Sequence, residues 1–303
     1  MSNQIQIIRT NIRSFLWEKL PWLGNFVRSI KGNLNKFEGG TDHVPSQVVG
    51  VLERYSQLIG DRNFTVTDKV CLELGTGNSP DIAFLMLLGG ASRSLMVDTE
   101  PLMKVPFQNG KEYEELVNYL SNESTRSSIK FPQIPANLNA VDLNQIAAKL
   151  EYVNYDGVHL PIPDASVDII YSKSVLEHVR EPEKLFQELR RISKPEAIHL
   201  HIVDLRDHFH IKDDNSVDGN WLEFLAYDEE TWERRCVKTH GWCNRLRLQS
   251  WYPIVKEAGF QILQENIIRI PLPTPSLPDK IKSVQDLDAA WWWVLLQVQG
   301  SKK

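Results

Sequence analysis

The feature that most restricts the fold is a short apolar strand that runs into a glycine turn and then a helix. Residues 70–74 read Val-Cys-Leu-Glu-Leu, the turn Gly75-Thr-Gly77 follows at once, and an apolar helical stretch begins at Asp81. Glycine suits a backbone that turns sharply or comes close to a ligand. This order of elements predicts the ligand crevice that an α/β sheet opens at the carboxyl ends of its strands.

From residue 68 onward, short apolar strands alternate with helices, which is typical of a parallel sheet covered on both faces. Seven segments are predicted as strands: 69–74, 94–98, 152–155, 167–171, 198–203, 259–263 and 291–298. Two stretches interrupt the alternation, and we interpret 101–150 and 206–247 as insertions that bind substrate. The sequence therefore predicts an α/β domain over residues 66–303, built on a mostly parallel seven-stranded sheet.

Residues 1–65 are predicted as an N-terminal helical cap. Ile5 and Ile8 belong to an apolar pattern with helical spacing, and a further helix is expected over 48–58. Basic side chains are frequent in residues 1–36, so an amphipathic helix resting on an anionic membrane is the alternative to a packed cap.

Composition narrows the class of protein. The 34 basic and 39 acidic side chains give a net charge of -5, which disfavours a nucleic-acid partner. Three cysteines are too few for a disulfide framework. Neither a secretory signal nor an apolar run of roughly 18 residues is present in the sequence. We expect a soluble cytoplasmic protein whose oligomeric state stays open.

The residues around the glycine turn indicate a cationic ligand. The third glycine of a dinucleotide fingerprint is absent, with Pro80 in its place, and the acidic Glu73 precedes the turn. A carboxylate is unfavourable beside a pyrophosphate and favourable beside a positive charge. Asp98 ends the next predicted strand, where an acidic residue reaches the ribose of an adenosine ligand. The alternatives are that Asp98 caps a helix or that Glu100 takes its place.

These residues resemble the class I S-adenosylmethionine-dependent methyltransferases, whose first motif reads Glu-x-Gly-x-Gly. Residues 68–205 follow the family in order, with matching segments at 70–80, 156–168, 169–178 and 189–195. The family has a glycine pair where this chain has Glu196-Ala197, a departure that affects a turn more than the chemistry.

The resemblance implies a Rossmann-like fold, S-adenosylmethionine as cofactor and S-adenosylhomocysteine as product. By the same resemblance, the methionine end of the cofactor lies in a cradle of Glu73, Gly75, Thr76, Gly77 and Asn78. Asp98 would hold the ribose, and Asp156 with Gly157 would read the adenine. Ser172 would line the gap through which the methyl group passes.

Methyl transfer mainly requires that acceptor and methyl group be held in line. A hydroxyl acceptor must also lose its proton, for which histidine is the usual general base, whereas a neutral amine needs none. His208 is the first candidate and His178 the second, with Asp204 as an orienting or substitute carboxylate. The alternative is that these residues only cap strand ends and turns. His199 and His201 alternate with apolar residues and are predicted as sheet residues.

No bound metal is expected. Some methyltransferases of small RNAs and of the ubiquinone pathway carry Glu-x-x-Glu-His at this point and bind a divalent ion. Ser174 replaces the first carboxylate here, so Glu177, His178 and His208 would form only a partial site. Residues 236–243 read Cys-x-x-x-His-x-x-Cys, a zinc-like fragment without an evident fourth ligand.

Two features of the 206–247 segment bear on the acceptor. Its clustered aromatic side chains suit either a pocket for an apolar or ring-bearing acceptor or a cap that packs its own core. Arg245 and Arg247 suit either an acceptor carboxylate or a solvated helix face.

The favoured function is O-methylation of a small molecule, in specialised metabolism or in the modification of a glycan or lipid precursor. N-methylation is the nearest alternative. A nicotinamide-dependent oxidoreductase and a non-catalytic protein that keeps the fold are further alternatives, and macromolecular methylation is disfavoured by the charge.

Overall fold

The computed structural model describes residues 44–77, 79–99, 107–213, 216–217, 220–236, 242–273, 281 and 283–300. The predictions made for residues 1–36 lie outside these residues. Within the described part, no helix combines the length and apolar character that crossing a membrane requires.

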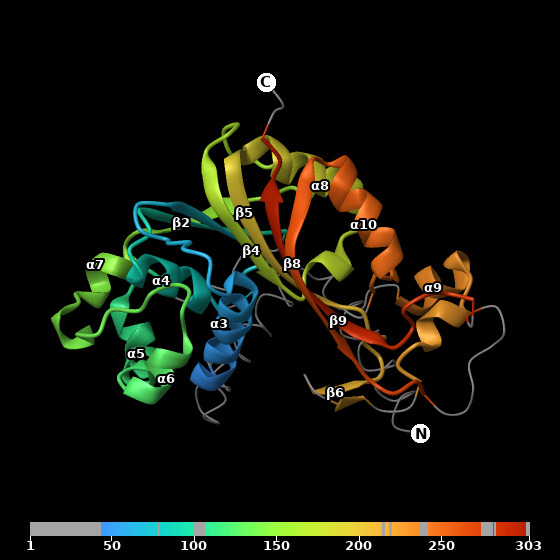
Figure 1. Ribbon diagram of the computed structural model, residues 1–303, viewed down its shortest axis with the longest axis horizontal. Coiled ribbons are helices and arrows are strands. Elements are labelled where there is room, and N and C mark those ends of the chain that lie inside the picture. Colours follow the sequence, from blue (N-terminus) through green and yellow to red (C-terminus); the bar gives the residue numbers. More distant parts are fainter. Residues whose placement is uncertain are drawn as a thin grey trace, which may run out of the picture.

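A seven-stranded sheet in the order β3-β2-β1-β4-β5-β9-β8 forms the centre of the molecule (Figure 1). Its strands are β1 (Val70–Leu74), β2 (Arg93–Asp98), β3 (Leu150–Asn154), β4 (Val167–Lys173), β5 (Ser193–Asp204), β8 (Phe260–Arg269) and β9 (Ala289–Val298). The strands from β3 to β5 pair in parallel, whereas β9 runs antiparallel to both β5 and β8. The predicted mostly parallel, Rossmann-like sheet is confirmed.

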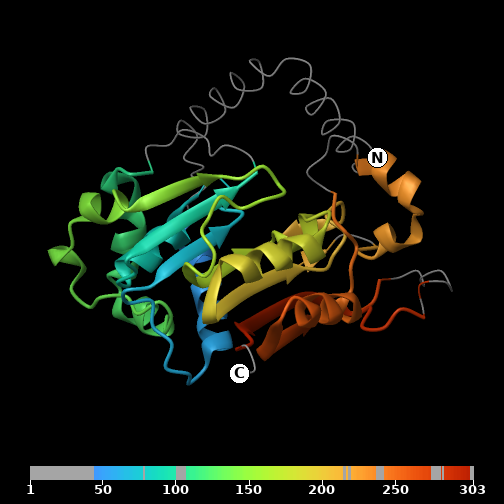
Figure 2. The ribbon, with the colours of Figure 1, turned by 90° about the horizontal axis from the view of Figure 1, so that it is seen from above.

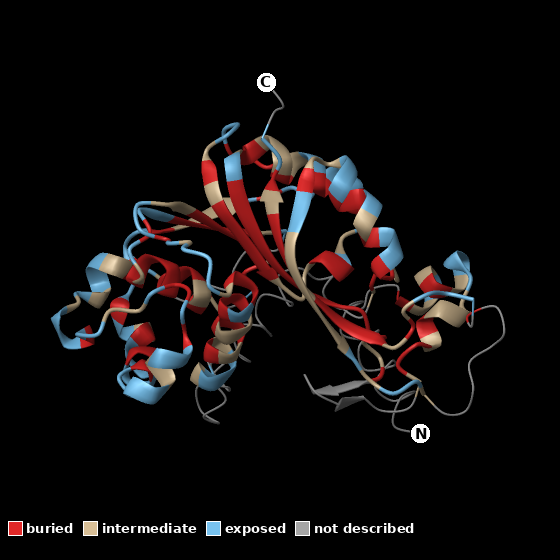
Figure 3. Cartoon of the chain, viewed as in Figure 1, coloured by how far each residue is buried: buried red, intermediate tan, exposed pale blue. Residues whose placement is uncertain are grey.

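Each face of the sheet carries its own hydrophobic core. Successive strand residues point to opposite faces, so Cys71 belongs to one cluster and its neighbour Leu72 to the other. The helices α3 (Pro45–Ile59) and α4 (Asp81–Leu88) contribute to the Cys71 cluster, and α8 (Pro182–Ile192) and α10 (Leu248–Glu257) to the Leu72 cluster. Figure 3 shows the strands as a buried layer between these helices, and Figure 2 shows the same layers from above.

Helix α3 confirms the helix expected over 48–58. Pro45 stands in its first turn, where the absent N–H costs nothing. Its buried side chains include Leu52 and Tyr55, which join the same core as α4, and the helix contacts β8 and β9. Helix α3 therefore packs against the sheet.

The segment between β2 and β3, within the stretch 101–150 that was interpreted as an insertion, forms short helices. These are η1 (Gly110–Tyr113), α5 (Glu114–Leu120), α6 (Glu123–Ser128), η2 (Leu138–Ala140) and α7 (Leu143–Ala147). The Tyr113 ring stacks on Phe84 of α4 with the ring centroids 3.9 Å apart. Asn122 and Asp142 accept backbone N–H groups at the starts of α6 and α7, which short polar side chains do well.

The segment between β5 and α10 contains β6 (Ile211–Asp213), β7 (Ser216–Val217), η4 (Glu223–Ala226) and α9 (Glu229–Cys236). Trp221, Phe224 and Trp232 are almost completely buried, and Tyr227 stacks on Trp232. Of the two alternatives for this aromatic cluster, these buried rings support a cap that packs its own core.

Both roles predicted for Arg245 and Arg247 were wrong, because their guanidinium groups donate hydrogen bonds to backbone carbonyl groups of the protein. Arg247 is buried, and its guanidinium donates to the backbone oxygens of Leu205 and Asp286, among others. Arg245 donates to the backbone oxygen of Tyr227 at 2.8 Å and also to that of Phe224. A guanidinium carries five N–H donors and can satisfy several chain-end carbonyls at once.

Candidate active site

A cavity of about 380 Å³ lies at the carboxyl ends of the parallel strands. Its walls include Gly75 from the turn after β1, Asp98 at the end of β2 and Gly157 after β3. The opposite wall includes His178 of the short helix η3 (Leu176–His178) and Lys184 of α8. Two of the residues expected to hold the ribose and adenine thus share one cavity with a predicted catalytic histidine.

The glycine turn is fixed by backbone geometry. Gly75 has φ 73°, a left-handed conformation, and a Cβ placed on it would lie 2.3 Å from Cγ2 of Val175. Gly77 has φ 63°, and its N–H donates to Oδ2 of Asp98 at 2.8 Å. The Asp98 carboxylate is therefore tied to the glycine turn while it remains on the cavity wall.

Glu73 lies beneath the glycine turn, away from the cavity wall. Its side chain belongs to the opposite face of the sheet from the wall residue Leu74, because neighbouring strand residues alternate. The carboxyl accepts the N–H of Ala83 at the start of α4, and its Oε2 has no hydrogen-bond partner. Burial, then the charges of Asp81 and Asp98, raise the pKa of Glu73 well above its ordinary value.

Thr76, whose Oγ1 is also buried without a partner, lies in the same turn. Asn78 lies outside the described residues. The cradle expected from the sequence thus contains two buried side-chain oxygens that still lack a hydrogen bond, the Glu73 Oε2 and the Thr76 Oγ1.

The turn after β3 is held by Asp156. Its Oδ1 accepts the N–H groups of His159 at 2.9 Å and Val158 at 2.8 Å, and these bonds lower its pKa. Gly157 (φ 87°) and Val158 lie on the cavity wall. Asp156 therefore shapes the wall through its backbone neighbours.

Ser172 is a correction to the predicted site. Its hydroxyl is buried in β4 and lies 2.7 Å from Nδ1 of His201 in β5, so the structure does not place it on the cavity wall. His199 and His201 are completely buried within β5, as predicted for sheet residues, and burial lowers the pKa of His201 to about 3.

His178 is oriented by a backbone carbonyl group. Its Nδ1 lies 2.6 Å from the backbone oxygen of Trp242. A carbonyl oxygen only accepts, so Nδ1 of His178 carries the proton in this bond. Since His178 lies on the cavity wall, it is the better placed of the two predicted catalytic histidines.

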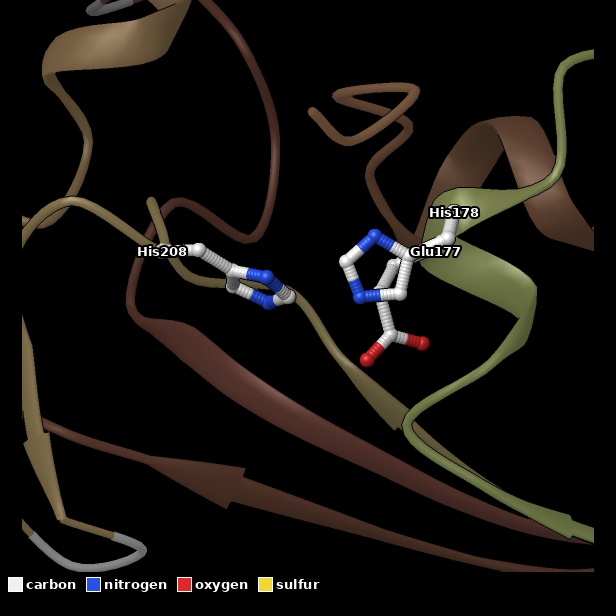
Figure 4. Close-up of side chains that lie close together, drawn as sticks. All are labelled: Glu177, His178 and His208. Atoms are coloured by element: carbon white, nitrogen blue, oxygen red, sulfur yellow. The ribbon is translucent and has the colours of Figure 1, made fainter. Parts of the chain in front are cut away.

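His208 and Glu177 lie beside His178 (Figure 4). The centroids of the two imidazoles are 4.7 Å apart, and burial lowers the pKa of His208 to about 4. Nε2 of His208 is buried without a partner. Glu177 is 2% exposed, and burial together with the charge of Asp204 raises its pKa well above the ordinary value. Three groups with proton-transfer or ligand chemistry thus converge.

Asp204 does not orient His208, which corrects the role expected for it. Both of its oxygens accept from the guanidinium of Arg206, at 2.9 and 2.7 Å. Nε2 of His208 lies 3.9 Å from Asp204 Oδ2, too far for a hydrogen bond. The Arg206 guanidinium also lies over the ring of Trp291, 4.5 Å from its centroid. Asp204 is therefore committed to the ion pair that ends β5.

The segment after α9 holds η3 in place, a role the sequence did not reveal. Asn244 donates its backbone N–H to the oxygen of Glu177 at 2.7 Å, and its side-chain amide donates to the oxygens of Leu176 and Val179. These partners lie more than sixty residues away in the chain, so no local pattern announces them.

Trp242, whose backbone oxygen accepts the hydrogen bond from Nδ1 of His178, is itself held in place. Its indole N–H donates to Glu233 at 2.8 Å, and the guanidinium of Arg180 lies 4.2 Å from the centre of its ring. Arg180 also bonds to Glu233 at 2.7 Å.

Two groups of side chains in the described part of the chain have metal-ligating composition. In the first, the ligand atoms of Glu177, His178 and His208 lie within 4.8 Å of one another. The second group is Asp207, His210 and Glu223. Its members are already bonded, because His210 Nε2 lies 2.6 Å from Glu223 Oε2 and Asp207 accepts backbone N–H groups.

The zinc-like fragment is only partly described. Cys236 and Cys243 are buried, and residues 237–241 between them lie outside the described part.

A family model described as a methyltransferase domain matches residues 109–200. The strand order with an antiparallel strand between β5 and β8, and a cavity joining Gly75, Asp98 and Gly157, agree with that match. Residues 109–200 of the chain are therefore similar to methyltransferase domains.

Curated relatives match the chain in part. A sterol 24-C-methyltransferase from Gibberella zeae is 22% identical over 191 residues, which is 61% of this chain and 42% of the relative. An uncharacterized methyltransferase from Mycobacterium sp. is 36% identical over 61 residues, 20% of this chain and 23% of that protein. The chain thus spans less than half the length of these relatives.

Solved structures of similar fold include a putative S-adenosylmethionine-dependent methyltransferase from Listeria monocytogenes, with 12% identity and a TM-score of 0.46. The match covers 83% of this chain and 99% of that one. A methyltransferase from Mesorhizobium loti has 15% identity and a TM-score of 0.43, over 77% of this chain and 92% of that one.

The site fits a cofactor that carries positive charge and an adenosine. Asp98 supplies a carboxylate at the cavity wall, and Glu73 supplies a buried carboxyl oxygen without a partner beneath the glycine turn. Gly75 lies on the cavity wall, and its lack of a side chain allows Val175 to pack against the turn.

Proposed function

We propose that this chain is an S-adenosylmethionine-dependent methyltransferase that transfers a methyl group to a hydroxyl oxygen of a small molecule. The observation that carries the proposal is that one cavity joins Asp98 and Gly157 to His178. Bound S-adenosylmethionine supplies a methyl group that its sulfonium already activates. The residues of the chain therefore have to position the acceptor and deal with its proton.

The arrangement around His178 supports an acceptor that must lose a proton. Its bond to the Trp242 oxygen fixes the imidazole on the cavity wall. Glu177 and His208 converge on the same point. We assign activation of the hydroxyl to these three residues, with His178 nearest the acceptor, because a neutral amine would need no such group.

Two observations favour a small acceptor. The cavity, about 380 Å³, has a size typical of small-molecule sites. The net charge of -5 disfavours a polyanion. We place the reaction in specialised metabolism or in the modification of a glycan or lipid precursor, in the cytoplasm.

We also propose that residues 1–65 act as a cap and that the insertions at 101–150 and 206–247 shape the acceptor side. Support comes from Trp242 and Asn244, which lie in the second insertion and hold η3 beside the cavity.

The test is a screen of hydroxyl- and amine-bearing small molecules with S-adenosylmethionine, followed by release of S-adenosylhomocysteine and mass spectrometry of the products. With a hydroxyl acceptor, we expect His178→Ala to lower kcat by about 10²–10⁴-fold and to change the affinity for S-adenosylmethionine little. Methylation of amines alone, insensitive to His178→Ala, would establish N-methylation instead.

A further inference from the structure

We propose that Glu233 of α9 is a positioning residue for His178, on which it acts through Trp242, and that Arg180 holds Glu233 in place. We call these four residues the clasp. The effect of the clasp on the orientation of the His178 ring is independent of the proposed function, and only its effect on methyl transfer rests on that function.

Contacts among the four residues form a closed ring. Nδ1 of His178 donates to the backbone oxygen of Trp242 at 2.6 Å. The Trp242 indole N–H donates to Oε1 of Glu233 at 2.8 Å. The two oxygens of that carboxylate also accept from the guanidinium of Arg180, at 2.7 and 3.2 Å. Arg180 follows His178 by two residues and lies on the same cavity wall, so the contacts lead from the wall through α9 and back to it.

The side chain of Trp242 is held from two directions. Its indole N–H is bonded to Glu233, and the Arg180 guanidinium lies 4.2 Å from the centre of the ring, where a cation is attracted to an aromatic face. The carbonyl group that His178 contacts belongs to the same residue. Glu233 and Arg180 therefore fix the hydrogen-bond acceptor of His178 together with the indole.

The charge of Glu233 strengthens the clasp. The hydrogen bonds from Arg180 lower the pKa of Glu233 more than its partial burial raises it, and the bond from Trp242 lowers it further. A charged acceptor makes the stronger hydrogen bond. The side chains of Arg180 and Glu233 are 62% and 37% exposed, and exposed ion pairs add little to the stability of a fold. The clasp therefore serves the orientation of the ring more than the stability of the protein.

The orientation of the ring decides what His178 can do. In a histidine, the hydrogen bond of one ring nitrogen determines which nitrogen carries the proton. The Trp242 carbonyl oxygen only accepts, so it keeps the proton on Nδ1 and holds the imidazole on the cavity wall. A group that exchanges a proton with an acceptor needs one fixed geometry, which neighbouring residues must supply. Glu233 supplies it without touching the acceptor.

The experiment records the ring nitrogens of His178 in the full-length protein labelled with ¹⁵N-histidine, at about pH 8.5, where an ordinary imidazole is neutral. Signals that are missing from His178→Ala identify the residue. In the wild type, we expect the proton on Nδ1. In Glu233→Ala, the two nitrogen signals should move toward the average of the two tautomers. The shift should be smaller in Glu233→Gln, because the amide oxygen can still accept the indole N–H.

Glu229→Ala is the matched control. Glu229 lies one turn earlier in α9, its side chain is 69% exposed, and it pairs with Arg245 as Glu233 pairs with Arg180. Its replacement removes a similar ion pair outside the clasp and should leave the signals of His178 unchanged. With a hydroxyl acceptor, Glu233→Ala should lower kcat by about 3- to 30-fold, with little change in the acceptor KM or in the affinity for S-adenosylmethionine.

Circular dichroism shows whether each variant is folded, and Glu233→Gln decides the matter if Glu233→Ala does not fold. Wild-type signals of His178 in Glu233→Ala overturn the proposal, because the hydrogen bonds of Asn244 would then suffice to hold the segment. An equal shift in Glu229→Ala also overturns it, since general loosening of α9 would be the cause. Shifted signals in Glu233→Ala alone, without methylation of any hydroxyl by the wild type, contradict the proposed function and support the clasp.

Discussion

The two sides of the cavity are built on different principles. On the cofactor side, the backbone conformation determines the shape of the site. Gly75 and Gly77 adopt left-handed conformations, and Asp98 is bonded to the turn. On the acceptor side, side chains from distant segments converge, and buried atoms of Glu177 and His208 lack partners. Buried polar atoms without a hydrogen bond occur on both sides, such as Oγ1 of Thr76 in the glycine turn and Nε2 of His208. The two sides therefore differ in whether the residues that form them are close in the sequence.

The largest effect is expected at the glycine turn. Gly75→Ala places a Cβ 2.3 Å from Cγ2 of Val175 at φ 73°, so we expect a drop in thermal stability and at least about a tenfold loss of S-adenosylmethionine affinity. Gly77→Ala is the matched control, since it has φ 63° but open space around the new Cβ. The free energy of unfolding of Gly77→Ala should fall by only about 1–2 kcal/mol. Equal losses in both variants, measured by melting and calorimetry, would show that the contact with Val175 is unimportant.

A smaller effect is expected on the acceptor side. Asn244→Ala removes the amide that bonds to Leu176 and Val179, so η3 loses its clamp and kcat should fall by about tenfold, at a cost of about 1–3 kcal/mol in stability. Affinity for S-adenosylmethionine should change little.

Ser193→Ala is the control for this clamp, because it removes buried hydrogen bonds at the opposite end of β5. It should lower the stability and leave kcat unchanged. If both variants lower kcat to the same degree, the loss reflects general destabilisation and the clamp has no special role.

The smallest expected effect is an increase in stability, at Glu73. The folded pKa of Glu73 is raised above its unfolded value, mainly by burial. The folded state therefore binds more protons, and the wild type loses stability as the pH rises above about 4.5. Without cofactor, Glu73→Gln should melt at a higher temperature than the wild type at pH 7, with the difference shrinking toward pH 4. A melting difference that is constant with pH would contradict this account.

The sequence predicted the cofactor side better than the acceptor side for a physical reason. The strand from 70 to 74, the glycine turn and Asp98 lie within thirty residues, and their geometry follows from local preferences. The roles predicted for Ser172 and Asp204 were wrong because the polar atoms of these residues already bind other side chains. Ser172 is bonded to His201, and Asp204 to Arg206. Trp242 and Asn244 reach η3 only through the tertiary fold, so the motif around His178 gave no sign of them.

The most direct test of the central claim is a calorimetric titration of the purified protein with S-adenosylmethionine and, separately, with NADH, repeated with Asp98→Ala. The account predicts micromolar binding of S-adenosylmethionine, no binding of NADH, and at least about a tenfold loss of affinity in the variant, or about 1.4 kcal/mol. Binding of NADH, or of neither ligand, would contradict it.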